Sequence, residues 1–122
     1  MHYLDLDAFK PLNDTHGHAF GDLVLQEIAR RLGAAVREED VVARVGGDEF
    51  VVLSQRPHGS TLGGAAERIA EAVAAPMTVD GRTVQVRASV GRAVASPGRS
   101  AQEVLADADA AMYGVKRAQA RR

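Results

Sequence analysis

The sequence predicts an α+β domain with a central antiparallel sheet and flanking helices. Three observations support this prediction. Apolar residues recur with a period of two in some short segments and a period near 3.6 in longer ones. Gly, Pro, Asn and Asp cluster between these segments, where turns are expected. The resulting order is strand, helix, strand, strand, helix, strands, helix, and its first six elements follow the split βαβ plan of ferredoxin-like folds.

The first half of the chain supplies a strand, a helix and a hairpin. Residues 1–6 are predicted to form a short strand, and residues 7–18, rich in turn formers, a loop. A helix is expected over residues 20–36. Residues 41–45 and 50–53 are predicted strands, and the segment between them reads as a hairpin turn. The apolar stripe of the helix consists of Val24, Leu25, Ile28, Leu32 and Ala35.

The second half repeats this alternation. A helix is expected over residues 60–75 and ends before Pro76. Short and long strands are predicted at 77–79 and 83–95, separated by the turn signal Asp80-Gly81. Ser100 and Glu103 have the spacing of a capping box and open a last helix.

Composition limits the classes of protein that the chain can be. Its 122 residues suit one domain, and a net charge of −1 gives no bulk attraction to nucleic acid or membranes. It has no cysteine for disulfides or thiolate metal sites, which fits a cytoplasmic protein. No apolar segment approaches the length of a membrane span. We therefore expect no nucleic-acid partner and no membrane contact by this domain.

Two acidic segments are candidates for chemistry. Asp5 and Asp7 end the first strand, and Asp48 and Glu49 lie at the hairpin tip. In a split βαβ sheet these segments are neighbours, so Asp5 and Asp48 could share one cation. Hard carboxylate ligands suit Mg²⁺, which also binds substrate phosphates. Spacing alone leaves two interpretations open: metal-assisted phosphoryl transfer, or acidic turn residues in water.

The ordered motifs along the chain resemble the GGDEF domains, the diguanylate cyclases. Residues 5–22, DLDAFKPLNDTHGHAFGD, are similar to the opening signature of that family, and residues 46–50 are its naming motif, GGDEF. SVG at 89–91, and ADAAMY at 108–113 with Lys116, resemble the late strand and last helix. The resemblance implies a nucleotide-cyclase or polymerase-palm fold and a reaction that joins two GTP into cyclic di-GMP and two pyrophosphates.

The resemblance also implies roles for individual residues. Asp5, Asp48 and the Leu6 carbonyl would hold Mg²⁺ or Mn²⁺. Asp48, Glu49 and Lys10 would be catalytic, with Glu49 helping to activate or orient the ribose 3′-hydroxyl. Asn13 and Asp22 would bind the guanine edge, while the other substrate contacts would come from two lysines and backbone N–H groups. These other contacts are Lys10, Lys116, Ala8 and Phe9.

A second, inhibitory site for the product cyclic di-GMP is implied by Arg37 and Asp40, five residues before the GGDEF motif. Arg44 and Arg68 resemble the arginines that complete it, the latter from a neighbouring subunit. Guanidinium groups pair with phosphate and stack on guanine. By itself an Arg-x-x-Asp pattern is as compatible with an ordinary charged surface loop.

Two departures from the family pattern bear on activity. The arginine expected four residues after Lys116 is replaced by Ala120, preceded by Gln119, and Arg121 lies one position further along the helix. The chain also begins at the first strand, without the front segment and helix of the family. We therefore expect a single GGDEF domain over 1–122, truncated at its N-terminus, whose parent chain carries a sensor domain upstream.

The sequence thus predicts a cytoplasmic, magnesium-dependent diguanylate cyclase of bacterial signalling, inhibited by its product. Catalysis would need a homodimer, because each domain binds one GTP. The alternative is a weak or inactive GGDEF module that senses cyclic di-GMP through Arg37 and Asp40, or GTP through the former active site. The intact Asp5, Asp48, Glu49 and Lys10 favour the enzyme.

Overall fold

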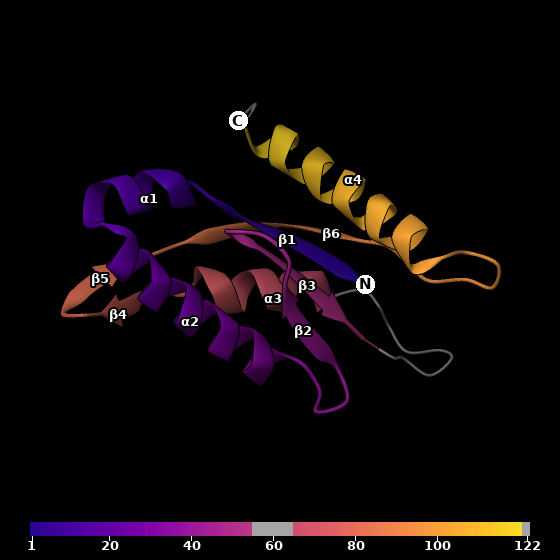
Figure 1. The fold of residues 1–122 in the computed structure, drawn as a ribbon, viewed down its shortest axis with the longest axis horizontal. Coiled ribbons are helices and arrows are strands. Elements are labelled where there is room, and N and C mark those ends of the chain that lie inside the picture. Colours follow the sequence, from indigo (N-terminus) through magenta and orange to yellow (C-terminus); the bar gives the residue numbers. More distant parts are fainter. Residues whose placement is uncertain (55–64, 121–122) are drawn as a thin grey trace.

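A computed structural model describes residues 1–54 and 65–120 of the chain. These residues form a four-stranded sheet, a separate two-stranded hairpin and four helices (Figure 1). In chain order the elements are β1 (His2–Asp7), α1 (Phe9–His16), α2 (His18–Ala35), β2 (Val41–Arg44), β3 (Glu49–Leu53), α3 (Ala65–Ala74), β4 (Met77–Val79), β5 (Arg82–Val84), β6 (Arg87–Arg92) and α4 (Ala101–Ala120).

The main sheet has the order β2-β3-β1-β6, and every neighbouring pair is antiparallel. This is the predicted ferredoxin-like arrangement, with the first strand in the interior of the sheet. β1 pairs with β3 on one side and with β6 on the other, so Asp5 lies opposite Glu49 and Ser89. The two predicted acidic segments are therefore neighbours across one strand pair.

The two faces of the sheet carry different helices. The main core lies on the face covered by α2 and α3. Its largest fully buried side chains come from β1, α2, β3 and α3 and include Leu4, Leu6, Val24, Ile28, Leu32, Phe50, Val52 and Val73. Four of the five residues of the predicted α2 stripe are thus in the core.

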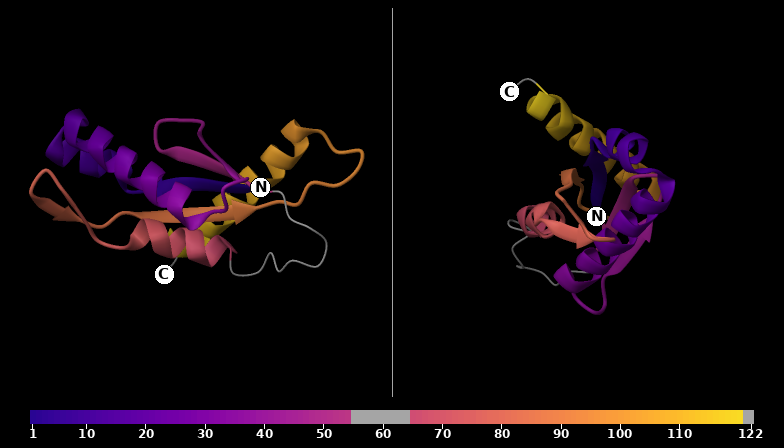
Figure 2. Two further views of the ribbon diagram at one scale, coloured as in Figure 1. Left: turned by 90° about the horizontal axis from the view of Figure 1, so that it is seen from below. Right: turned by 90° about the vertical axis from the view of Figure 1, so that its left-hand side faces the viewer.

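The helix α4 packs across β6 and β1 on the other face (Figures 1 and 2). Its buried contacts are Val104, Ala108 and Met112. A Cβ atom placed on Gly91 would lie 2.0 Å from the Met112 nitrogen and 2.5 Å from the Ala108 oxygen. The absence of a side chain at Gly91 is what allows the helix to approach the strand so closely.

The predicted loop at 7–18 is wrong, because residues 9–16 form the helix α1. Phe9 is buried in the core, and Pro11 lies in the first turn, where a missing N–H costs no helical hydrogen bond. Residues in the positive-φ region mark the two ends of the helix instead. Ala8 adopts φ 59° before the helix, and Gly17 adopts φ 91° between α1 and α2. Burial of Phe9 outweighs the local turn propensity.

The predicted strand at 83–95 is also wrong in extent. Residues 82–84 pair with β4 in the small hairpin, and the main sheet takes residues 87–92. Between them the Gln85 side chain donates to the Ala74 carbonyl at 2.7 Å, so the chain leaves one sheet before joining the other.

The capping box predicted at the start of α4 is confirmed by reciprocal hydrogen bonds between Ser100 and Glu103. The first residues of the predicted helix at 60–75 lie outside the described residues, as does Arg121.

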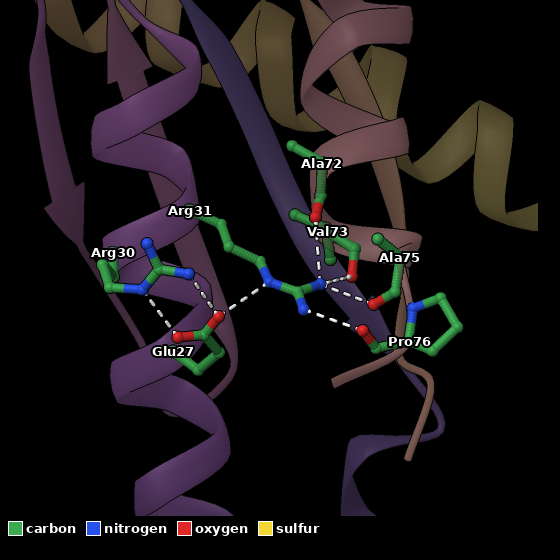
Figure 3. Close-up of polar contacts among 7 residues, drawn as sticks. All are labelled: Glu27, Arg30, Arg31, Ala72, Val73, Ala75 and Pro76. Carbon is green, nitrogen blue, oxygen red and sulfur yellow. Dashed lines mark hydrogen bonds and ion pairs between the residues drawn. The ribbon is translucent and has the colours of Figure 1, made fainter. Parts of the chain in front are cut away.

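A polar clamp joins α2 to the end of α3 (Figure 3). Arg31 donates to the carbonyls of Ala75 at 2.5 Å and Pro76 at 3.0 Å, and to two more in the last turn of α3. Glu27 accepts from Arg31 at 2.9 Å and from Arg30 at 2.7 Å. A cation at a helix C-terminus satisfies carbonyls that lack helical partners.

Among residues 1–54 and 65–120, none of the helices combines the length and the apolar character that a membrane span needs.

Candidate functional site

The candidate site forms where β1 ends beside the β2–β3 turn. The Leu6 N–H donates to the Asp48 carbonyl at 3.0 Å, which extends the β1–β3 ladder into the turn. This bond and the register of Asp5 with Glu49 place the carboxylate of Asp48 in the field of Asp5. The structure therefore brings together the three residues predicted to hold a metal.

Lys116 reaches this site from α4. Its ammonium lies 2.8 Å from Asp5 Oδ2 and 3.7 Å from Asp7 Oδ1. Burial alone would lower the pKa of Lys116, but the hydrogen bond with Asp5 and the nearby carboxylate charges outweigh burial and raise that pKa. The lysine is therefore a fixed positive charge at the edge of an acidic group.

The acidic group has the properties of a cation site. Burial, followed by the charge of Asp5, raises the pKa of Asp48. Asp5 Oδ1 is buried without a hydrogen-bond partner. Among the described residues, no three His, Cys, Asp or Glu side chains cluster as a metal centre. Two carboxylates and a carbonyl instead fit Mg²⁺, which takes few protein ligands and completes its shell with water and phosphate oxygens.

A cavity of ≈ 230 Å³ opens beside Asp48. It is lined by residues of α1, α2, the end of β2 and the β2–β3 turn. Five of the residues predicted to act on substrate line it together, and four others complete the wall. The nine are Phe9, Lys10, Asn13, Asp22 and Asp48, with His18, Leu25, Arg44 and Gly47.

Asn13 is held over the start of α2 by the lack of a side chain at Gly21. A Cβ atom at Gly21 would lie 1.7 Å from Asn13 Oδ1 and 3.3 Å from the ring of Phe9. Asn13 Oδ1 is buried and has no hydrogen-bond partner. The amide is thus packed in place with an unsatisfied acceptor beside the cavity, which is a state suited to binding a ligand donor.

The backbone at Ala8 supplies a second kind of group. Ala8 is in the left-handed region, which is uncommon for a residue with a Cβ atom. It starts α1, whose first N–H groups have no partners within the helix. Anions bind readily to such groups. Lys10 follows in the same turn and is exposed, so its charge is available at this helix end.

Ser89 links Asp7, at the end of β1, to Gln119, at the end of α4. Its fully buried hydroxyl donates to Asp7 Oδ1 at 2.9 Å, and the side-chain oxygen of Gln119 lies 3.1 Å from the same hydroxyl. Gln119, which precedes the position of the missing family arginine, is therefore part of the polar group behind Asp7.

The residues predicted for a product site are not gathered in the described part of the chain. Asp40 accepts from the Arg37 N–H at 2.9 Å and closes the turn before β2, while both Arg37 and Arg68 have exposed side chains. Arg44 points elsewhere: it donates to the Gly47 carbonyl at 2.9 Å and lines the cavity beside Asp48. The inhibitory site stays a prediction, with Arg44 placed against the turn of the candidate active site.

Sequence reasoning missed three residues of this region. His18 lines the cavity and Gly21 makes room for Asn13. Tyr3 donates a hydrogen bond to Glu49 at 2.5 Å. The period of two along β1 was the available signal, because it places Tyr3 on the same face as Asp5 and Asp7.

The family model described as "Diguanylate cyclase, GGDEF domain" matches residues 1–122. The chain belongs to the GGDEF family. This GGDEF domain is 40% identical over 115 residues to the bifunctional diguanylate cyclase/cyclic di-GMP phosphodiesterase MucR of Pseudomonas aeruginosa, covering 93% of the chain and 17% of MucR. It is 43% identical over 118 residues to diguanylate cyclase TpbB of the same species, covering 94% of the chain and 27% of TpbB.

A third relative, diguanylate cyclase A of Treponema denticola, is 38% identical over 117 residues, covering 93% of the chain and 31% of that protein. The GGDEF domain thus spans less than a third of each of these three curated relatives. Other relatives are named for the opposite activity: the cyclic di-GMP phosphodiesterase PdeR of Escherichia coli is 37% identical over 115 residues, covering 93% of the chain and 17% of PdeR.

Solved structures agree with the fold. Diguanylate cyclase SiaD of Pseudomonas aeruginosa, in complex with its activator SiaC, matches with a TM-score of 0.88 and 37% identity over 96% of this chain and 45% of that one. The GGDEF domain of DgcB from Caulobacter crescentus, in complex with c-di-GMP, matches with a TM-score of 0.85 and 33% identity over 96% and 71%.

Proposed function

We propose that this GGDEF domain is a diguanylate cyclase that condenses two GTP molecules into cyclic di-GMP with release of two pyrophosphates. The observation that carries the proposal is the convergence of Lys10, Asn13, Asp22 and Asp48 on one cavity. Asp5 acts electrostatically on Asp48, which lines that cavity, and Lys116 is paired with Asp5. These groups are chemically complementary to a guanine base, a triphosphate and a divalent cation.

The carboxylates of Asp5 and Asp48, with the Leu6 carbonyl, are the residues that would hold Mg²⁺ or Mn²⁺. The unpartnered Asp5 Oδ1 and the raised pKa of Asp48 both fit a site whose negative charge needs a cation. Such an ion, when bound, neutralises phosphate charge and makes the α-phosphorus more electrophilic.

The remaining groups would orient the nucleotide. Asn13 and Asp22 offer acceptors to the N–H groups of the guanine edge. Lys10, which lines the cavity, and the free N–H groups at the start of α1 would bind the triphosphate, and Lys116, which is paired with Asp5, would add a further positive charge. The domain supplies these contacts from three separate elements.

The reaction needs a second copy of the domain. In each half-reaction the 3′-oxygen of one GTP attacks the α-phosphorus of the other and loses its proton to water, a new P–O bond forms, and pyrophosphate leaves as the old bond breaks. Glu49, beside Asp48, would orient the attacking hydroxyl. Because each domain binds one GTP, two domains must face each other as a homodimer. GTP as substrate also implies a cytoplasmic location.

The test is incubation with GTP and Mg²⁺, followed by chromatography of the nucleotides. Cyclic di-GMP and pyrophosphate should form, and Asp48→Asn should reduce the rate on the order of 100-fold or more while the protein melts normally. Asp80→Asn is the matched control, since Asp80 is an exposed carboxylate in the β4–β5 turn. Equal rates for Asp48→Asn and Asp80→Asn would contradict the assignment.

A second candidate function is that of a receptor that binds cyclic di-GMP. In an active enzyme, binding of cyclic di-GMP at the same site would inhibit the cyclase. Asp40 Oδ1 is buried without a hydrogen-bond partner, and the side chain of Arg37, whose backbone N–H bonds the other oxygen of Asp40, is exposed. A domain of similar sequence occurs in a protein named a phosphodiesterase and not a cyclase, which supports this second function. Calorimetry with cyclic di-GMP tests it: Arg37→Ala should weaken binding by about tenfold or more, because a charge-assisted pair is lost. Equal affinities would exclude the site.

A further inference from the structure

A tyrosine lies behind the turn that carries Glu49. The Tyr3 hydroxyl donates to Glu49 Oε2 at 2.5 Å. A bond of this length between a hydroxyl and a carboxylate is at the short, strong end for O–H···O⁻ contacts. It joins residues 46 positions apart, and it is made from the face of β1 that also carries Asp5 and Asp7.

The backbone of Tyr3 is held from two sides. β1 is an interior strand, hydrogen-bonded to both β3 and β6, so the backbone of Tyr3 is fixed. Its register partner on β6 is Gly91, the residue against which the backbone of α4 packs. A tyrosine side chain has only two torsions, so once the ring is packed the hydroxyl position is defined.

Among the described residues, the Glu49 side chain is held by this bond and by its own turn. The β2–β3 turn has Gly46 and Gly47, and a Cβ atom on Gly46 would lie 2.8 Å from Glu49 Oε1. The carboxylate therefore folds over a glycine, with one oxygen on Tyr3. No other hydrogen bond to the Glu49 side chain occurs among the described residues. The bond and burial raise the pKa of Tyr3, which keeps its hydroxyl a donor.

The structure assigns Tyr3 as the positioning residue of Glu49. The inference rests on the proposed function, in which Glu49 orients the attacking 3′-hydroxyl. Tyr3 does not touch the substrate; it fixes the direction in which Glu49 presents its second oxygen. A group positioned in this way contributes to the transition state more than to substrate binding.

The kinetic experiment compares Tyr3→Phe with Tyr113→Phe. The chain has two tyrosines, and Tyr113 is exposed on α4, so its variant controls for loss of a hydroxyl elsewhere. Tyr3→Phe should lower kcat by about tenfold with less than about a twofold change in KM for GTP. In a Glu49→Gln background the same change should have little further effect, because the partner is already altered.

A second measurement reads the contact without turnover. In protein labelled at the tyrosine ζ-carbon, the Tyr3 resonance, assigned by its loss in Tyr3→Phe, should shift in Glu49→Gln while that of Tyr113 stays in place. An unmoved Tyr3 resonance would overturn the contact. An active wild type with unchanged kcat in Tyr3→Phe would overturn the positioning role alone. A wild type that makes no product would overturn the proposed function, and with it the reaction in which Tyr3 acts.

Discussion

Replacing Gly91 with alanine should push α4 away from the sheet. The added methyl carbon would lie 2.0 Å from the Met112 nitrogen, 2.5 Å from the Ala108 oxygen and 2.6 Å from the Ala111 carbonyl carbon. All three are backbone atoms of one helix, so no rotamer change can relieve the contact. The helix itself must retreat by more than an ångström to reach ordinary van der Waals separation.

The cost follows from what α4 buries. Val104, Ala108 and Met112 are its buried residues on this face, and a gap of about 1 Å forfeits up to half of the dispersion energy of such contacts. Overpacking in cores typically costs about 1–3 kcal/mol, and a clash with backbone belongs at the upper end. We expect a loss of about 3 kcal/mol in the free energy of unfolding, which lowers the melting temperature of a domain this size by roughly 10 °C.

Thermal unfolding followed by circular dichroism measures this effect, with Gly114→Ala as the matched control. Gly114 lies in the same helix, and a Cβ atom there would meet nothing within 4 Å. Alanine at a helical glycine should stabilise by about 0.5–1 kcal/mol, so the two substitutions should have opposite signs. Equal melting temperatures for Gly91→Ala and wild type would refute the close approach of α4 to β6.

Three further predictions concern α2. Gly21→Ala should displace Asn13 and raise the Kd for GTP by about tenfold, because the added methyl carbon would lie 1.7 Å from Asn13 Oδ1 and 3.3 Å from the Phe9 ring; titration calorimetry measures the change, and an unchanged Kd would contradict the packing. Arg31→Ala should cost about 2–3 kcal/mol in urea unfolding, since four carbonyls lose their donor; a cost near zero would show that water replaces the clamp. The hydrogen bonds from Arg30 and Arg31 lower the pKa of Glu27 from 4.5 to about 2. Its stabilisation is therefore present above pH 4.5 and lost as pH falls toward 2, so the melting temperatures of wild type and Glu27→Gln should converge across that range; a constant difference would refute the shift.

Most of the fold follows from local patterns in the sequence. The order of the strands, the helices α2, α3 and α4, the stripe of α2, the hairpin turn at the GGDEF motif and the capping box of α4 were readable from periodicity and turn chemistry, whereas α1 was not. The neighbouring placement of Asp5 and Asp48 also followed, because a split βαβ order leaves few ways to pair the first strand. The local features depend on residues close together in the chain, and the placement of Asp5 and Asp48 follows from the order of the elements.

The rest was decided by contacts between distant residues. Nothing local shows that Phe9 reaches the core and makes a helix of a turn-rich segment, or that residues 83–92 divide between two sheets. The roles of Gly21 and Gly91 depend on what would touch an absent side chain, which a sequence does not contain. The bond of Tyr3 to Glu49 likewise exists only once β1 and β3 pair in register. The sequence determined which groups the site contains, and the tertiary structure determined how they are held, because packing acts through space and not along the chain.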